Sequence, residues 1–284
     1  DLSFLALLSI TFSCSQTQEN FSTICVLPNQ LKEASACEIS NASPLIWTIE
    51  DNHNDNILFG FNEKGELQKK IRITNVENND WEDLTSDDQG NIYIGDFGNN
   101  DNDRENLAIY KIKAEDLNKD ETEAESVVQF YYPEQTEFPP KKKDRIFDVE
   151  SFFIHNNKFY LFTKNRSSKL DGTTVLYEVE NNSTQKLPAK KLGSFVTCEQ
   201  FNHCAVTSAD ISPDKRKVAI LSSDKVWIFT NWKDNNFISG NVEKIELNHF
   251  TQKEGLCFKD ENTILMTDEG GKKQTGNLYQ LKLK

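Results

Sequence analysis

The stretch that decides the fold is Trp81-Glu82-Asp83-Leu84-Thr85-Ser86-Asp87-Asp88-Gln89-Gly90-Asn91-Ile92-Tyr93-Ile94-Gly95-Asp96. Its centre, Asp88 to Asn91, is a polar run that favours the positive φ angles of a tight turn, and Ile92 to Ile94 suits a buried strand. A hairpin returns the chain on itself. We therefore expect Glu82, at the start of the first strand, and Asp96, at the end of the second, at the same end of one strand pair.

The same layout occurs five times along the chain. Each repeat has an acid-led segment, a turn, an apolar second strand and a third strand with an aromatic residue, and a fainter fourth strand is visible in several. The leading acids are Glu38, Glu82, Glu150, Asp210 and Glu254, which are 44, 68, 60 and 44 residues apart. Units of about 40 to 50 residues with four short strands are typical of β-propeller blades.

No long segment has the 3.6-residue apolar period of a helix, so the sequence predicts an all-β fold. We expect a β-propeller of five four-stranded blades, with a sixth, degenerate blade inside the long repeats as the alternative. Only 30 residues follow Glu254, too few for a complete last blade. The segment Phe21 to Leu27 is expected to supply the missing outer strand and to close the ring, which covers an exposed sheet edge. Residues 21–284 would then be a single domain.

Residues 1–14 have the pattern of an export signal. The apolar run from Leu2 to Cys14 is shorter than the roughly 20 residues that cross a bilayer as a helix, and it ends in a small residue and a cysteine. This resembles a bacterial lipoprotein signal, in which Cys14 becomes the lipidated N-terminus, and residues 15–20 would be a tether. A simple cleaved signal and an N-terminal strand are the alternatives. We expect an exported protein that faces the periplasm or the cell surface and contacts the membrane only through its lipid.

Export permits disulfides. Cys198 and Cys204 are expected to close a small loop. Cys25 could pair with Cys37, which the sequence leaves open, and Cys257, between two apolar residues, is expected to be a buried free thiol. No cysteine spacing is typical of a zinc site.

The formal net charge of −13 argues against a nucleic-acid-binding protein, because phosphate backbones are bound by clustered Lys and Arg. The sequence contains no Gly-x-Ser-x-Gly, His-Glu-x-x-His or phosphate-loop motif. We therefore expect a monomer whose partner is a small molecule or a protein.

The leading acids begin the strands that line the central channel of a propeller. We expect them to form a carboxylate ring at the channel mouth, with Glu38, Glu82, Glu150, Asp210 and Glu254 as candidate metal ligands. Ligands that offer only oxygen suit a hard cation, Ca²⁺ before Mg²⁺. The alternative is that each acid accepts hydrogen bonds from backbone N–H groups of its own blade.

Loops after the second strands are expected on the same face. Acids or amides end those strands at Glu50 or Asp51, Asp96, Asn165 and Asp268. The candidate ligand-binding residues are Asp96, Asn99, Arg104, Arg166 and Asp268. The two arginines could clamp a carboxylate or phosphate of a ligand, or pair with the acids of the ring.

Six short segments carry a family resemblance: residues 81–84, 92–100, 104–110, 209–214, 254–256 and 267–270. They resemble exported bacterial propellers, in particular the SdiA-regulated family and the esterase-like, phytase-like propellers, across roughly residues 35 to 283. The resemblance implies a ligand or metal site at the channel mouth and no established reaction. Sugar lactonases of the regucalcin type are similar in having a Glu/Asp/Asn metal centre, but their particular ligands have no clear counterparts in this sequence.

Two functions remain open. The first is a cell-envelope lipoprotein whose acidic propeller face binds a ligand or a protein, with Ca²⁺ as a bound ion. The second is a metal-dependent hydrolase of a phosphoester or lactone. In the second, Glu82, Glu150 and Glu254 would hold the metal, another carboxylate would be the general base, and Arg104 would bind the anion.

Overall fold

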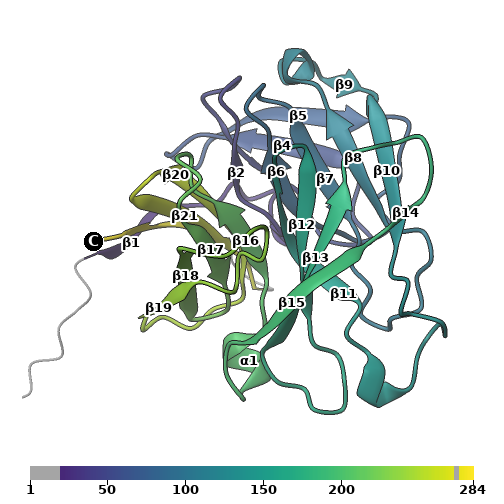
Figure 1. The fold of residues 1–284 in the computed structure, drawn as a ribbon. Helices are drawn as coiled ribbons and strands as arrows, with labels where there is room; N and C mark the ends of the chain where they lie inside the picture. The colour runs from purple at the N-terminus through teal and green to yellow at the C-terminus, as the bar shows by residue number, and fades with distance from the viewer. Residues whose placement is uncertain (1–19, 272–274) are drawn as a thin grey trace, which may run out of the picture.

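Residues 20–271 and 275–284 are described in the computed structural model, which is a five-bladed β-propeller (Figure 1). The predicted fold class is confirmed. The inner strands of neighbouring blades contact one another around the ring, in the order β2, β6, β11, β16, β20 and back to β2. The predicted signal segment 1–14 with Cys14, and the tether up to residue 19, lie outside the described residues.

Each blade is built outward from its inner strand, mostly by antiparallel pairing. Blade one contains β2 (Glu38–Ile39), β3 (Ile46–Thr48), β4 (Ile57–Phe61), β5 (Leu67–Ile73) and the short β9 (Glu121–Thr122). Blade two contains β6 (Trp81–Ser86), β7 (Ile92–Asp96), β8 (Ala108–Ile112), β10 (Ser126–Tyr131) and the short β14 (Leu187–Pro188). Blade three contains β11 (Asp148–His155), β12 (Lys158–Lys164), β13 (Thr173–Glu180) and β15 (Lys190–Val196). Blade four contains β16 (Ser208–Ile211), β17 (Val218–Leu221), β18 (Lys225–Thr230) and β19 (Asn241–Glu246).

Blade five is assembled from both ends of the chain. Its order is β20 (Lys253–Asp260), β21 (Thr263–Asp268), β22 (Asn277–Lys282) and then β1 (Phe21–Val26). Phe21 lies opposite Leu281, and the pairing continues to Val26 through a bulge. The N-terminal strand thus covers the outer edge of β22, which would otherwise offer unpaired backbone groups to other chains.

Within residues 20–271 and 275–284, helical structure is confined to three single turns in the connections. They are η1 (Ala114–Asp116), η2 (Lys142–Asp144) and α1 (Phe201–Cys204). In the described part of the chain no helix is long and apolar enough to cross a membrane. A disulfide joins Cys198 to Cys204 around α1, whereas Cys25, Cys37 and Cys257 are free thiols, and Cys257 is fully buried as predicted.

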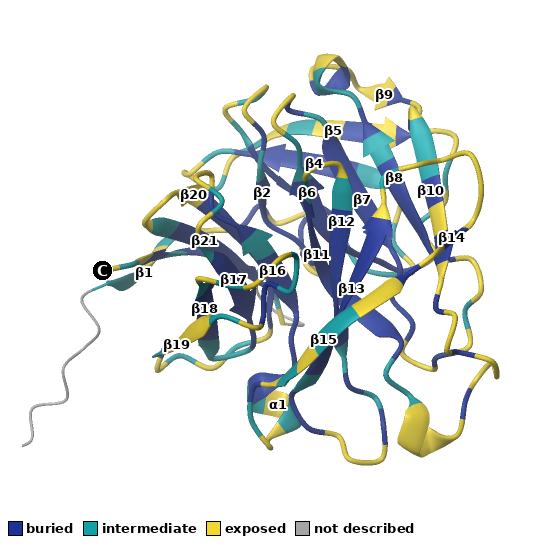
Figure 2. Cartoon of the chain, in the orientation of Figure 1, coloured by how far each residue is buried: buried dark blue, intermediate teal, exposed yellow. Residues whose placement is uncertain are grey.

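The hydrophobic core lies between the blades. Figure 2 shows that burial is concentrated in the inner and middle strands and that the outer strands are more exposed. All five residues of β7 are buried, whereas β5 alternates between buried and exposed positions, as an outer strand with one solvated face should. Phe97 of blade two packs edge-on against Phe152 of blade three, with ring centroids 5.0 Å apart. Such aromatic contacts hold neighbouring blades in a defined position relative to each other. They thereby set the relative positions of the side chains on the inner strands.

Candidate cation site

The five leading acids do not form one ring. Glu82, Glu150 and Glu254 lie together where their strands begin, and Glu150 raises the pKa of each of the other two. Glu38 instead accepts a hydrogen bond from Ser86 (2.9 Å), and Asp210 accepts one from the backbone N–H of Phe258 (2.8 Å). Ser86 and Phe258 are each four residues beyond the leading acid of their own strand, a rise of roughly 13 Å. The expected single ring is therefore wrong, and two acids lie deeper along the channel.

The carboxylates of Glu38 and Asp210 accept hydrogen bonds from backbone N–H groups, which is the alternative that the sequence left open. Glu38 also accepts from the N–H of Ile39 (2.9 Å), and Asp210 from that of Ile211 (2.7 Å). Burial raises the pKa of Glu38 well above its usual value, and it raises that of Asp210 to about 7. Their positions separate them from any metal held at the other end of the channel.

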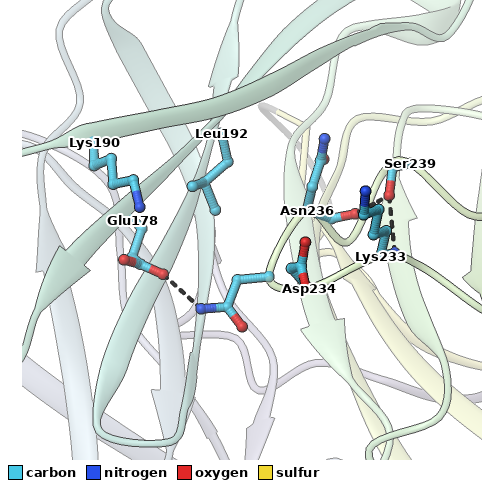
Figure 3. Close-up of a pocket in the computed structure, with 8 residues that line it drawn as sticks. Glu178, Lys190, Leu192, Lys233, Asp234, Asn236 and Ser239 are labelled. Carbon is cyan, nitrogen blue, oxygen red and sulfur yellow. Dashed lines mark hydrogen bonds between the residues drawn. The ribbon is translucent and has the colours of Figure 1, made fainter.

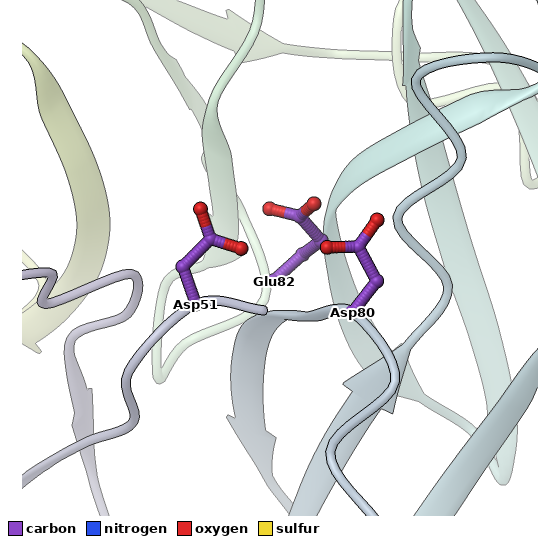
Figure 4. A group of neighbouring side chains, drawn as sticks. All are labelled: Asp51, Asp80 and Glu82. Atoms are coloured by element: carbon purple, nitrogen blue, oxygen red, sulfur yellow. The ribbon is translucent and has the colours of Figure 1, made fainter. Parts of the chain in front are cut away.

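A compact carboxylate group forms at the mouth from Asp51, Asp80 and Glu82 (Figure 4). One oxygen from each of the three lies within 4.8 Å of the others. Asp51 lies in the loop after β3. Asp80 and Glu82 flank Trp81 at the start of β6, and since side chains two apart in an extended chain point to the same side, both acids face Asp51. We call these three residues the acidic triad.

Asp80 and Glu82 are buried, Asp51 is partly buried, and none of the three forms an ion pair in the described residues. Asp80 is 7% exposed and Glu82 is 5% exposed. Burial, and then Asp51, raise the pKa of Asp80 to about 6; burial, and then Glu150 and Asp51, raise that of Glu82 well above its usual value. The Asp80 Oδ1 atom is buried and has no hydrogen-bond partner among the described residues. A buried, unpaired acceptor between like charges is costly unless a cation joins it.

Gly98 makes the room for the triad. A Cβ atom on Gly98 would lie 2.1 Å from Glu82 Oε1 and 2.4 Å from Asp80 Oδ2. The two carboxylates therefore occupy the space that any other side chain at position 98 would need. Glycine at this position is required by the close approach of the acids.

The neighbouring cationic side chains form ion pairs with other acids. Arg166 donates to Asp148 (2.5 Å) and to Glu150 (2.7 Å), and Lys164 donates to Glu150 (2.9 Å). Burial acts to raise the pKa of Glu150, but Lys164 and Arg166 outweigh it, so this pKa lies below its ordinary value. Glu150 is therefore compensated, whereas the triad beside it is not.

Two further carboxyls border the triad. Burial raises the pKa of Glu254 to about 8 although Lys164 opposes the shift. Burial and then Asp51 raise the pKa of Glu269 to about 7. Both can exchange protons near neutral pH.

The predicted ligand-binding acids at the ends of second strands are held within their own blades. Asp96 accepts from Arg104 (2.8 Å) and from the hydroxyl of Tyr110 (2.9 Å). Asp268 accepts in the same way from the hydroxyl of Tyr279 (2.6 Å). A carboxylate at the end of a second strand bonded to a tyrosine of the third strand thus recurs in blades two and five.

Asn99 and the two arginines also have partners inside the protein. The N–H of Asn99 donates to Asp148 (2.7 Å), and its side-chain oxygen accepts from the N–H of Arg104 (3.0 Å). Arg104 also donates to the carbonyl oxygen of Gly98 (2.7 Å). The sequence left two roles open for Arg104 and Arg166, binding a ligand anion or pairing with acids. In the structure both arginines pair with acids.

Sequence reasoning missed Asp80, Asp148 and Lys164. Asp80 had a usable signal, because it stands two residues before Glu82 and an extended segment directs both side chains to one side. Lys164 follows an apolar second strand, and its sequence gives no sign that it reaches across to Glu150.

A surface hollow lies elsewhere, between β13, β15 and the loop after β18 (Figure 3), with a volume of about 510 Å³. One of its acids, Glu178, already accepts from Lys158 (3.0 Å), Tyr160 (3.2 Å) and Asn235 (2.8 Å). Its wall lacks the group of three converging carboxylates that the triad has.

No protein-family model matches the sequence, and no curated protein matches it. Among solved structures, the chain is similar to the PQQ-bound form of an aldose sugar dehydrogenase from Streptomyces coelicolor, with a TM-score of 0.54 and 6% identity over 92% of this chain and 97% of that one. A putative gluconolactonase matches with a TM-score of 0.48 and 10% identity over 88% and 74% of the two chains. At these identities the similarity shows the propeller fold alone.

The close approach at Gly98 predicts a strong effect of one methyl group. Gly98→Ala should lower the free energy of unfolding by about 1–3 kcal/mol, because the added Cβ overlaps the Glu82 and Asp80 carboxylates. Urea denaturation measures this change. The matched control is Gly271→Ala, where a Cβ meets no described atom within 4 Å and the change should stay within about 0.5 kcal/mol. Equal stability of the two variants would contradict the packing described.

The raised carboxyl pKa values predict how stability depends on pH. The folded protein keeps protons on Asp80, Glu269 and Glu254, with pKa values of about 6, 7 and 8, where the unfolded chain has already released them. Stability should therefore fall as the pH rises from about 5 to about 8 in the presence of a chelator. Urea midpoints across this range test the sign, and Asp80→Asn should reduce the slope. A flat or rising profile would refute the assignment.

Proposed function

We propose that this propeller binds a divalent cation, Ca²⁺ before Mg²⁺, at the acidic triad, and that the cation in turn binds a ligand at the channel mouth. The observation that carries the proposal is that one carboxylate oxygen from each of Asp51, Asp80 and Glu82 lies within 4.8 Å of the other two, while Oδ1 of Asp80 has no hydrogen-bond partner in the part of the chain that the structure describes. Two oxygens on one Ca²⁺ ion, each about 2.4 Å from it, lie no more than about 4.8 Å apart. The spacing of the triad fits one shared ion.

The donor set favours a hard cation. All three side chains offer carboxylate oxygen, which suits Ca²⁺ and Mg²⁺ better than the softer transition metals. Ca²⁺ takes six to eight oxygen ligands, and Mg²⁺ demands a stricter octahedron. A loop carboxylate such as Asp51 beside two strand carboxylates suits the more tolerant ion. Three protein residues leave coordination positions for water or for a ligand.

The ligand of such a site would be rich in oxygen. A carboxylate, a phosphate or neighbouring hydroxyl groups can complete the coordination of a bound Ca²⁺ ion, on a small molecule or on a partner protein. A free anion without the cation would meet repulsion from the triad, since Arg104 and Arg166 are already paired. Ligand binding should therefore depend on the cation.

The cellular context in this proposal is the cell envelope. The lipoprotein-type segment 1–14, with Cys14 as the anchor, would present the propeller to the periplasm or the cell surface. The resemblance to the SdiA-regulated and esterase-like, phytase-like propellers supports the same setting. Ca²⁺ sites of extracellular modules are commonly weak, with dissociation constants of about 10⁻⁴–10⁻³ M.

A second candidate, a metal-dependent hydrolase of a phosphoester or lactone, is favoured by one observation. Glu254 and Glu269 border the triad, and burial brings their pKa values to about 8 and about 7, which suits proton transfer near neutral pH. In this candidate Glu82 would hold the metal and Glu254 would move the proton. Glu150 suits the metal role less well than the sequence indicated, because Lys164 and Arg166 neutralise it.

Calcium titration tests the first proposal. Ca²⁺ at a hundred times its dissociation constant should raise the Tm of the chelator-treated protein by about 5 °C. Asp80→Asn and Glu82→Gln should each weaken binding at least about tenfold in calorimetry, because each removes a charged ligand. The control is Asp88→Asn, an exposed acid in the β6–β7 turn that should bind like wild type. If neither Ca²⁺ nor Mg²⁺ shifts the Tm, the proposal fails.

An activity screen separates the two candidates. A hydrolase should cleave an ester, lactone or phosphoester only with metal present, and Glu82→Gln and Glu254→Gln should each lower kcat/KM by about 100-fold or more. Initial rates at saturating Ca²⁺, Mg²⁺ or Mn²⁺ provide the measurement. Activity that is indifferent to both substitutions removes these roles, and calcium binding without any turnover supports the ligand-binding function.

A further inference from the structure

The junction between the first and last blades brings two cysteines together. Cys37 directly precedes β2 and Cys257 lies in β20, so they come from the inner strands of blades one and five. Their sulfur atoms are 3.5 Å apart although the residues are separated by 220 positions in the chain. Both side chains have no exposed surface.

The backbone around this pair is held closely. A Cβ atom on Gly255 would lie 2.4 Å from the carbonyl carbon of Ala36 and 2.5 Å from the backbone nitrogen of Cys37. The hydroxyl of Thr267 donates to the carbonyl oxygen of Ala36 (3.1 Å). Blade five therefore presses directly on the chain that carries Cys37, and the two sulfurs face each other across a fixed contact.

Much of the surroundings of the pair is apolar. Cys37 and Cys257 belong to one buried cluster with Leu27, Leu265 and Leu278 among its members, and Cys25 packs against that cluster. Each thiol has the other as its sulfur partner, and the buried carboxyls of Glu38 and Asp210 are close enough to raise the pKa of Cys257.

We propose that Cys37 and Cys257 form a disulfide that closes the propeller ring at its inner edge. A disulfide has a sulfur–sulfur distance of about 2.05 Å, so the two sulfurs must approach by about 1.5 Å. The two strands are already in backbone contact at Gly255 and Cys37, so the approach falls to the two cysteine side chains. In the structure both thiols are free, and the proposed bond replaces the free thiol expected at Cys257; it differs from the Cys25–Cys37 pairing that the sequence left open, and Cys25 keeps its thiol.

The bond needs an oxidant of the disulfide class, as does the Cys198–Cys204 bond of the same chain. A thiolate of one cysteine attacks an external disulfide and releases one external thiol; the second cysteine then attacks the mixed disulfide and releases the other. The two cysteines lose two protons and two electrons, and the external disulfide becomes two thiols.

This reaction belongs to folding rather than to the finished protein. Both sulfurs are inaccessible in the folded state, and burial, together with Cys37, raises the pKa of Cys257 well above its usual value. A buried thiol with little thiolate exchanges slowly. The bond therefore forms as the ring closes, and it then resists reduction.

The proposed bond complements the outer closure. At the rim, β1 closes blade five through hydrogen bonds to β22. At the axis, the disulfide would hold β20 next to the chain entering β2, so that the ring cannot open between its first and last blades. Linking residues 220 positions apart also restricts the unfolded chain strongly.

Peptide mapping of the full wild-type chain, exported to an oxidising compartment, tests the bond directly. The protein is denatured in an excess of alkylating agent without reductant, digested and analysed by mass spectrometry. We expect one cross-linked peptide pair containing Cys37 and Cys257, and an alkylated Cys25. Alkylation of both Cys37 and Cys257, or a cross-link of either one to Cys25, would overturn the proposal.

Thermal melting supplies an independent measurement. In a Cys198→Ser/Cys204→Ser background, protein refolded under reducing conditions should melt at least about 5 °C below the oxidised protein. Adding Cys37→Ala and Cys257→Ala should abolish this difference, whereas adding Cys25→Ser should preserve it. Equal melting temperatures of the oxidised and reduced background protein would overturn the proposal.

Discussion

Each inner strand of the propeller is an edge strand, hydrogen-bonded to a neighbouring strand on one side only. The rest of the structure depends on this constraint. The free N–H groups of each inner strand face the buried axis and need acceptors. Neighbouring inner strands supply them through side chains. The N–H of Phe152 donates to Asp83 (3.3 Å) and that of Leu256 to Ser208 (3.0 Å). Polar residues on the inner strands are therefore a requirement of closing five sheets around an axis.

This constraint sorts the acids of the channel. Asp83 and Asp210 lie where inner-strand N–H groups need acceptors, and their oxygens are used for that purpose. Asp80 directly precedes β6 and Glu82 is the second residue of that strand. Of the triad, Asp51 accepts from the backbone N–H of Asn52, whereas no backbone N–H donates to the side chains of Asp80 and Glu82 in the described part of the chain. These two carboxyls are therefore the ones that the backbone does not use.

The repeat of acid, turn and apolar strand predicted the five blades and the N-terminal closing strand, because strand pairing depends on local patterns that the sequence displays. The positions of the inner strands relative to one another along the channel axis do not follow from these local patterns. Glu38 and Glu82 both lead their repeats, yet Glu38 meets Ser86 instead of Glu82. That offset is set by packing between blades one and two, where Trp47 and Trp81 belong to one buried cluster. No single repeat contains the information, so the ring of five acids could not be tested from spacing.

The cationic side chains at the channel mouth neutralise some of the buried acids and leave others without an ion pair. Lys164 and Arg166 neutralise Glu150 and Asp148, which shows that this fold can place cations between buried acids. Arg104 comes near Asp80, but its guanidinium donates to Asp96 and to the carbonyl of Gly98. Asp80 and Glu82 have no such ion pair among the described residues, and burial and the neighbouring acids raise their pKa values. Their charge is therefore balanced by protons or, in the proposed function, by a bound cation.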